Sequence, residues 1–293
     1  MANTLDETLI GFFDDAAVFP PRLSPLNRAV QEHLRNRTRP LGTAVGPLIL
    51  PLKDIPQAGQ LAIAVAGRAD DAVDLASNPL RLGVVVPVGE LAAAIETATR
   101  LPPEVVVDAL ELKTSPGKSI LAIEIEQARK AADSFRVFVE LTLDQISDGA
   151  LGAIEGTPVM LKYRTGGLEA GLFPSSRELA TVIKAAVGHD VSFKLTAGLH
   201  EAVRFTNSRT GLTHHGFLNI AIATASARGG VDVDALTAIL EERDGTVLAD
   251  KYREYPNDWR HSFLSFGTCS VSEPAESLVE LGLLSESSLK AVT

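Results

Sequence analysis

The chain carries two lysines, Lys162 and Lys194, inside short apolar runs of the kind that form buried strands. Side chains alternate along a strand, so Lys162 shares one face with Arg164, and Lys194 shares one face with Thr196. An ammonium group is costly to bury unless it is paired or used in chemistry. Burial and a neighbouring cation both lower the pKa of an amine, and a neutral amine can form a Schiff base with a carbonyl compound. The two lysines therefore predict imine chemistry.

A structural salt bridge is the alternative for each lysine. Two further strand-like runs carry acidic residues near their ends, Glu111 in one and Glu140 in the other. Either carboxylate would satisfy a lysine at a strand end. We favour a functional role for at least one lysine, with Lys162 as the nucleophile, and the pattern leaves open which of the two forms the imine. Glu140 and Lys194 would then tune and position Lys162, and either His200 or Glu111 would move protons.

Glycine-rich turns follow the same strands and predict an anion site. Backbone N–H groups of such a turn, leading into a helix, form a positive concavity for phosphate or carboxylate. The planar guanidinium of Arg164 suits bidentate recognition of the same groups. The alternative is that the glycines only permit tight turns. The residues expected to hold the anion are Arg164, Thr165, Gly166, Gly167, Thr196, Gly198, Gly267 and Ser270.

The histidines supply a rival interpretation. His200 directly follows one lysine-bearing run, and as an acid or base it would titrate near neutral pH. Together with Glu111 and Glu140, histidines such as His200, His214 and His215 would instead ligate a divalent metal of a hydrolase, isomerase or lyase. The histidines lack the usual spacing of metal ligands, which weakens this alternative. The imine route needs neither a metal nor an organic cofactor, because the protonated imine serves as the electron sink. Surface or capping roles are the alternative for His214 and His215.

The elements that must position these side chains follow from periodicity. Eight apolar runs, at 46–52, 61–66, 82–87, 105–112, 136–143, 158–163, 191–196 and 262–266, alternate with amphipathic stretches. This pattern is typical of parallel strands joined by helices, and eight such units predict a (β/α)8 barrel covering residues 1–293. An open doubly wound sheet is the alternative. Function in such a barrel lies at the carboxyl ends of the strands.

Helices are predicted at 90–100, 119–132 and 176–187, and capping boxes at Ser175 with Glu178 and at Ser270 with Glu273. Residues 1–45 read as an N-terminal extension that caps the barrel or contacts a second copy of the chain. In it, Asp14 and Asp15 belong either to a helix cap or to a loop facing the substrate. Residues 199–260 read as a long insertion with helices at 217–227 and 233–242, placed to act as a lid.

The order of the strand-end motifs resembles the deoxyribose-phosphate aldolase group of class I aldolases. Residues 136–140 are similar to that family's fifth strand, 162–166 to its Lys-Thr-Ser-Thr-Gly sixth strand, 194–198 to its seventh and 266–270 to its eighth. The resemblance implies a (β/α)8 barrel with Lys162 as the Schiff-base lysine and Lys194 as the cation that lowers its pKa. It also implies an acidic residue of the fourth strand in proton transfer, which is either Asp108 or Glu111.

The composition of the chain excludes several classes of function. The 293 residues carry 27 Lys and Arg against 37 Asp and Glu, a net charge of −10, so the chain lacks the basic footprint of a nucleic-acid binder. A single cysteine, Cys269, excludes an intrachain disulfide and a Cys-rich zinc site, and reads as a small buried side chain. No run approaches the length of a membrane span, and the start of the chain does not resemble a signal peptide. We expect a cytoplasmic enzyme acting on a small anionic carbonyl compound, with a metabolite-binding barrel without catalysis as a further alternative.

Overall fold

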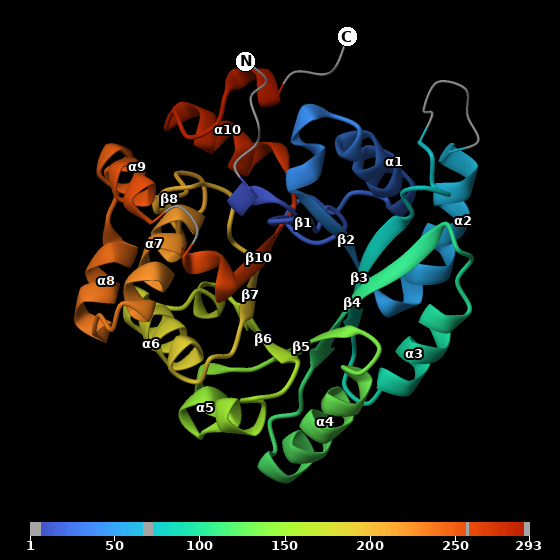
Figure 1. The fold of residues 1–293 in the computed structure, drawn as a ribbon, viewed down its shortest axis with the longest axis horizontal. Coiled ribbons are helices and arrows are strands. Elements are labelled where there is room, and N and C mark those ends of the chain that lie inside the picture. Colours follow the sequence, from blue (N-terminus) through green and yellow to red (C-terminus); the bar gives the residue numbers. More distant parts are fainter. Residues whose placement is uncertain (1–6, 67–72, 256–257, 290–293) are drawn as a thin grey trace.

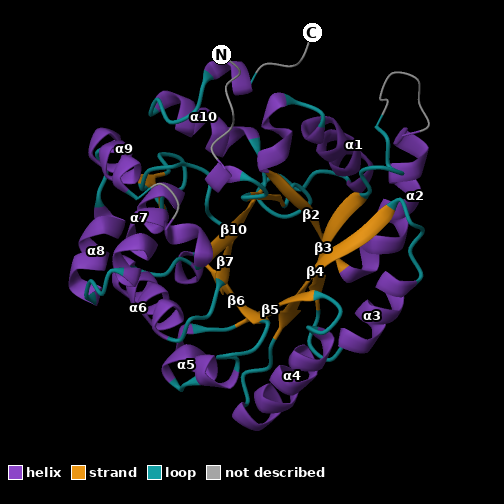
Figure 2. Ribbon diagram, viewed as in Figure 1, coloured by secondary structure: helices purple, strands orange, loops and turns teal. Residues whose placement is uncertain are grey.

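The computed structural model describes residues 7–66, 73–255 and 258–289, and in them eight parallel strands close into a barrel. Figure 1 looks down this ring, and Figure 2 shows the strands inside a layer of helices. The order around the barrel is β1-β10-β7-β6-β5-β4-β3-β2. The predicted barrel is confirmed, and the open sheet is wrong. The strands are β1 (Phe13–Asp15), β2 (Val45–Pro51), β3 (Leu80–Val86), β4 (Val105–Lys113), β5 (Arg136–Glu140), β6 (Val159–Arg164), β7 (Phe193–Thr196) and β10 (Phe263–Thr268).

Helices cover the outer face of the barrel, and each of the three helices predicted by its bounds is present. Buried residues recur along them at helical spacing, as the amphipathic stretches require. None of the helices in the described ranges is long and apolar enough to cross a membrane. The helices are α1 (Leu26–Arg37), α2 (Ile55–Ala66), α3 (Leu91–Thr99), α4 (Lys118–Ala131), α5 (Leu143–Ser147), α6 (Ser176–Gly188), α7 (Phe217–Arg228), α8 (Val233–Glu241), α9 (Gly245–Glu254) and α10 (Ser272–Glu280).

The strand predicted at 61–66 is wrong, because these residues form the last half of α2. The run alternates alanine with larger apolar residues, which also suits a strand buried on both faces. In the helix the buried positions are Ile55, Ala58, Ala62 and Val65, spaced three and four apart. Alanine is the best helix former, and this single apolar stripe is enough to dock the helix.

The segment 1–45 is not an extension that precedes the first strand, because it contains β1 and α1. β1 is only three residues long, yet it pairs in parallel with β10 on one side and with β2 on the other, and so closes the barrel. Asp14 and Asp15 are the last two residues of this strand. Their side chains point to opposite faces, since Asp14 contacts Lys194 inside the barrel and Asp15 contacts His33 of α1.

An aromatic cluster packs β1 against elements from the C-terminal part of the chain. The Phe12 ring lies with its centroid 4.9 to 6.2 Å from five other aromatic rings and is 1% exposed. These rings come from β1, α7, β10 and the turn that precedes β10. Burial of so many large side chains fixes a strand that is too short to be held by its own hydrogen bonds. The five partners are Phe13, Phe217, Trp259, Phe263 and Phe266.

The helices predicted within residues 199–260 are confirmed as α7 and α8, and α9 follows them. Every residue from Phe217 to Ala227 of α7 is buried, because the barrel covers one side of this helix, and α8 and α9 pack against it. Figure 1 shows α8 and α9 at the outer edge of the molecule, with α7 between them and the barrel. These helices therefore belong to the helical layer around the barrel and do not form the predicted lid. The short hairpin of β8 (Phe205–Thr206) and β9 (Thr213–His214) precedes them.

One of the two predicted capping boxes is confirmed. The Ser175 hydroxyl accepts a hydrogen bond from the Glu178 amide, and the Glu178 carboxylate accepts one from the Ser175 amide. The box at Ser270 is wrong, since α10 begins at Ser272 and the carboxylate of Glu273 binds His200 instead. That carboxylate is therefore turned away from the backbone and toward the mouth of the barrel.

Candidate active site

A pocket of about 390 Å³ opens at the carboxyl ends of the strands, where the chemistry of such barrels is expected. Four of the five predicted catalytic residues line it, and Glu140 lies outside its lining. Its remaining wall is largely apolar and comes from the loops after β1 and β6 and from β2 and β3. The predicted catalytic residues in the lining are Glu111, Lys162, Lys194 and His200.

Glu111 lies between the two lysines. Its Oε1 is 2.6 Å from Nζ of Lys194, and its Oε2 is 2.9 Å from Nζ of Lys162. All three side chains are at most 3% exposed. They come from β4, β6 and β7, so only the closed barrel brings them together. One carboxylate thus pairs with two buried ammonium groups, and the adjacent cations of the sequence prediction are separated by an anion.

The charges continue on both sides of this centre. On one side Lys194 also pairs with Asp14 of β1, whose Oδ2 accepts a hydrogen bond of 2.8 Å from the Ser265 hydroxyl of β10. On the other side Nζ of Lys162 lies 2.9 Å from Oε2 of Glu140, and the other oxygen of Glu140 lies 3.5 Å from Nε of Arg164. Anions and cations thus alternate across the barrel. We call this set the ionic chain: Asp14, Lys194, Glu111, Lys162, Glu140 and Arg164.

The ionic chain holds the lysines in the charged state. Burial lowers the pKa of Lys162, but Glu111 and Glu140 more than offset it, so the pKa is raised. The pKa of Lys194 is raised for the same reason by Asp14 and Glu111. The expectation that Lys194 lowers the pKa of Lys162 is therefore wrong for the protein without substrate. Burial raises the pKa of Glu111, but the two ammonium groups prevail and hold it at about 2.

The lysines differ in depth. Lys162 belongs to the lining of the pocket at the carboxyl ends of the strands. Lys194 lines this pocket and also a second cavity, of about 230 Å³, at the amino ends of the strands. That cavity also contains Asp14 and Phe138, and Nζ of Lys194 lies 5.3 Å from the centre of the Phe138 ring. Lys194 is thus the inner cation, and Lys162 is the outer one.

The predicted anion-binding residues separate into two groups. Arg164, Gly167, Thr196, Gly198 and Gly267 line the pocket. The others do not, and two of them hold the turns together: the Thr165 hydroxyl donates a 2.6 Å hydrogen bond to the Ala197 carbonyl, and Gly166 packs against Gly198. Ser270 lies in a neighbouring cavity between α1 and α10. A positive φ of 81° at Gly198 allows this close approach of the two turns.

Two further charged residues belong to the site: Lys113, to which the sequence analysis gave no role, and Asp14, whose role it left open between a helix cap and a loop facing the substrate. Lys113 is exposed, lines the pocket and lies two residues after Glu111 on β4, so strand parity was the available signal. Asp14 follows two phenylalanines, a pattern of apolar residues followed by charge that the other strand ends share. Asp108 lies at the opposite end of β4, paired with Arg81 and Arg136, so the acidic residue of the fourth strand in the pocket is Glu111.

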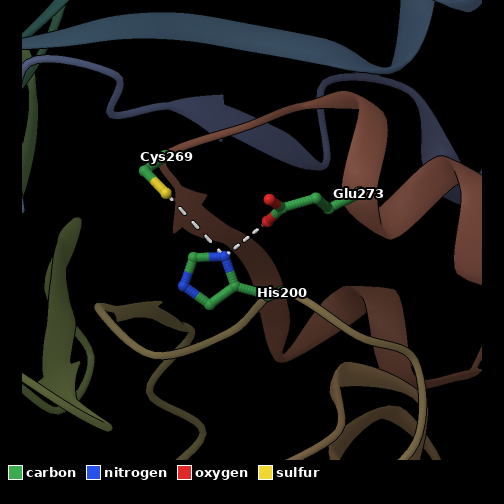
Figure 3. Close-up of side chains that lie close together, drawn as sticks. All are labelled: His200, Cys269 and Glu273. Carbon is green, nitrogen blue, oxygen red and sulfur yellow. Dashed lines mark hydrogen bonds and ion pairs between the residues drawn. The ribbon is translucent and has the colours of Figure 1, made fainter. Parts of the chain in front are cut away.

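His200 forms a small cluster with Cys269 and Glu273 at the rim of the pocket (Figure 3). Its Nδ1 lies 2.8 Å from Oε2 of Glu273 and 3.8 Å from Sγ of Cys269. Burial lowers the pKa of His200, but the hydrogen bonds with Cys269 and Glu273 outweigh it and raise the pKa to about 10. His200 is thus protonated at neutral pH, and the expectation of a histidine titrating near pH 7 is wrong. Both contacts use the same ring nitrogen, which differs from a nucleophile–His–acid triad, where they use opposite nitrogens.

The other two histidines have structural partners. His214 contacts the Gly198 carbonyl through Nδ1 at 2.9 Å, and His215 contacts the Pro174 carbonyl through Nε2 at 2.8 Å. Burial and the Arg204 guanidinium lower the pKa of His215 to about 4, so it is neutral. Neither histidine meets Glu111 or Glu140, whose carboxylates bind lysines. The metal site that the sequence offered as an alternative is therefore not assembled from these residues.

Comparison with known proteins adds no functional information to this geometry. The chain matches no protein-family model, and a search of curated proteins finds no similar sequence.

Proposed function

We propose that the protein is a lyase of the class I aldolase type, in which Lys162 forms an imine with a small carbonyl compound bearing a phosphate or carboxylate. The observation that carries the proposal is the pair of buried lysines at the floor of the pocket, on neighbouring strands and bridged by Glu111. Salt bridges that only stabilise a barrel seldom need this arrangement, because buried ion pairs contribute little net stability. The resemblance of the strand-end motifs to deoxyribose-phosphate aldolases points to the same chemistry.

Lys162 is the better nucleophile of the two because of its position. It is the outer cation, and its partner Glu140 is 18% exposed, whereas the partners of Lys194 are at most 2% exposed. A substrate that enters from the mouth therefore reaches Lys162 without disturbing the inner pairs. Lys194 and Asp14 then act as positioning residues that fix Glu111.

The raised pKa of Lys162 is compatible with this role. An ammonium group and a carbonyl compound combine to give a protonated imine and water, so the nitrogen carries one positive charge before and after the reaction. The carboxylates that stabilise the ammonium group therefore also stabilise the protonated imine. Only the attacking amine is transiently neutral, and Glu140, 2.9 Å from Nζ, is placed to hold the proton during the attack.

Bond cleavage then needs one base in the pocket. The proton of a hydroxyl group β to the imine passes to a carboxylate, the carbon–carbon bond breaks, and its electron pair moves to the imine nitrogen. This step gives a carbonyl product and a neutral enamine. The same carboxylate returns the proton to the enamine carbon, and water then releases the second product. Glu111 is the carboxylate that lines the pocket and contacts Lys162, so we assign this role to it.

The rim of the pocket indicates the kind of substrate. Arg164 and Lys113 bring positive charge to the lining and suit a phosphate or carboxylate group. His200, protonated at neutral pH, adds a third cation. The opposite wall is apolar and suits the carbon atoms of the substrate. It is formed by Ala16, Phe19, Pro20, Ile49, Val85, Leu168 and Leu172.

The test is reduction with borohydride in the presence of a panel of small aldehydes and ketones, followed by peptide mapping. We expect one covalent adduct per chain on Lys162, lost in Lys162→Met and retained in Lys130→Met, which removes an exposed lysine of α4. Circular dichroism checks that each variant is folded. An adduct on Lys194 alone would reassign the nucleophile. If neither lysine is labelled by any member of the panel, the proposal is refuted.

A further inference from the structure

The cluster shown in Figure 3 shares no residue with the ionic chain, and the chemistry proposed above uses only the charge of His200. His200 follows β7, Cys269 follows β10, and Glu273 is in the first turn of α10. One nitrogen, one sulfur and one oxygen atom from these residues all lie within 4.8 Å of one another. Three different elements of the fold thus bring three different donor atoms to one point.

The donors and their spacing suit a borderline transition metal. Zinc takes nitrogen, sulfur and oxygen ligands at about 2.0 to 2.3 Å, so tetrahedral donors lie roughly 3.3 to 3.7 Å apart. Here Nδ1 of His200 lies 3.8 Å from Sγ of Cys269 and 2.8 Å from Oε2 of Glu273. The third separation, between Sγ of Cys269 and the Glu273 carboxylate, is at most 4.8 Å, and the Glu273 side chain is 45% exposed, so its carboxylate has room to adjust to a metal ion.

The surrounding charge also favours a cation. Glu201, the next residue after His200, interacts electrostatically with Glu273 and with Glu280 of α10. Carboxylates are thus concentrated beside the three donors, which favours the binding of a cation.

We propose that His200, Cys269 and Glu273 bind a divalent cation of the zinc class at the rim of the pocket. Three protein ligands leave one position of a tetrahedral ion open, as in catalytic zinc sites. His200 and Cys269 line the pocket, so this open position faces it and would accept an oxygen atom of water, a carboxylate or a phosphate. The site uses none of the lysines, and a bound dication would replace the proton on Nδ1 of His200 as the positive charge at this part of the rim.

The single cysteine of the chain makes the test clear. Cobalt(II) is added to metal-free protein at neutral pH, and absorption by a thiolate–cobalt charge-transfer band is recorded in the near ultraviolet. We expect a band that saturates at about one cobalt per chain and disappears when zinc displaces the cobalt. Any such band must come from Cys269. It should be absent in Cys269→Ser and retained in Lys162→Met, so failure of the imine proposal would not affect it.

Calorimetric titration with zinc tests the other two ligands. Loss of partners that merely orient a metal ligand costs about 10- to 100-fold in affinity, so His200→Gln and Glu273→Gln should weaken zinc binding at least tenfold. The matched control is His189→Gln, because His189 pairs with Glu155 at the same 2.8 Å distance but without a cysteine. Should a variant fail to fold, protection of Cys269 from alkylation by zinc in the wild-type protein gives a second measurement. Absence of the cobalt band, or of this protection, overturns the proposal.

Discussion

Glu111→Gln tests the ionic chain most directly, because it removes one charge and almost no volume. The two lysines lower the pKa of Glu111 from 4.5 to about 2 despite its burial. Since one pKa unit corresponds to about 1.4 kcal/mol, folding stabilises the carboxylate by about 3 kcal/mol. We expect the variant to lose about this amount of unfolding free energy at pH 7, because glutamine leaves two buried ammonium groups facing each other.

The pH dependence has a defined sign. A carboxylate with a lowered pKa in the folded state stabilises the protein above its ordinary pKa and loses this effect as the pH falls through the folded value. The difference in stability between wild type and Glu111→Gln should therefore be full at neutral pH and shrink between about pH 4.5 and pH 2. Carboxylates outside the ionic chain titrate alike in both proteins and cancel in the difference, whereas Asp14 and Glu140 interact with Glu111 and contribute to it.

Urea denaturation followed by tryptophan fluorescence measures both effects, because Trp259 is the only tryptophan and is 1% exposed. The control is Glu96→Gln, which removes an exposed partner of Arg100 and should cost less than about 1 kcal/mol. A loss below about 1 kcal/mol for Glu111→Gln at pH 7, or a loss that persists undiminished at pH 2, would show that the carboxylate is not bound by both lysines.

Three further predictions concern residues that hold the strands, turns and helices around the site in place. Phe12→Ala should cost about 3 to 5 kcal/mol in urea denaturation, because five rings lose a partner, and a smaller loss would mean that other contacts hold β1. Gly166→Ala places a Cβ 2.9 Å from Cα of Gly198, so it should cost about 1 to 3 kcal/mol and reduce borohydride labelling, whereas unchanged labelling would show that the turn does not shape the pocket. In thermal denaturation, Ser175→Ala should lower the free energy of unfolding by about 1 kcal/mol and Ser270→Ala should lower it by less than about 0.5 kcal/mol. Equal losses would contradict the observed helix caps.

The barrel was predictable because most of its strands are continuous apolar runs covered on both faces. The two errors have physical causes. The run at 61–66 has the alternation of a strand, and only the packing of its alanines in α2 decides for the helix. β1 has three residues, two of them aspartates, and becomes a strand because β10 and β2 supply partners on both sides. Neither neighbour is close to it in the sequence.

The candidate site was predictable as a set of residues but not as a network. Lys162, Lys194 and Glu111 were found because each interrupts an otherwise apolar strand run, and the alternation of side chains along a strand indicates which face each one occupies. The pairing of Lys194 with Asp14 joins residues 180 positions apart, and nothing short of barrel closure reveals it. The direction predicted from the sequence for the pKa shift of Lys162 was wrong for a related reason. Whether an ammonium group faces another ammonium or a carboxylate depends on the placement of one side chain, Glu111, by a few ångströms.

Lys194 lines both the pocket at the carboxyl ends of the strands and the cavity at their amino ends, so at this point only its side chain separates the two. Changes at the amino ends of the strands, usually the region that governs stability alone, can therefore reach the proposed reaction centre. Gly46 of β2 illustrates this, since a Cβ there would collide with Oδ1 of Asp14, the partner of Lys194. Adaptive or damaging substitutions for this protein should accordingly be sought on the far end of the barrel as well as around the mouth.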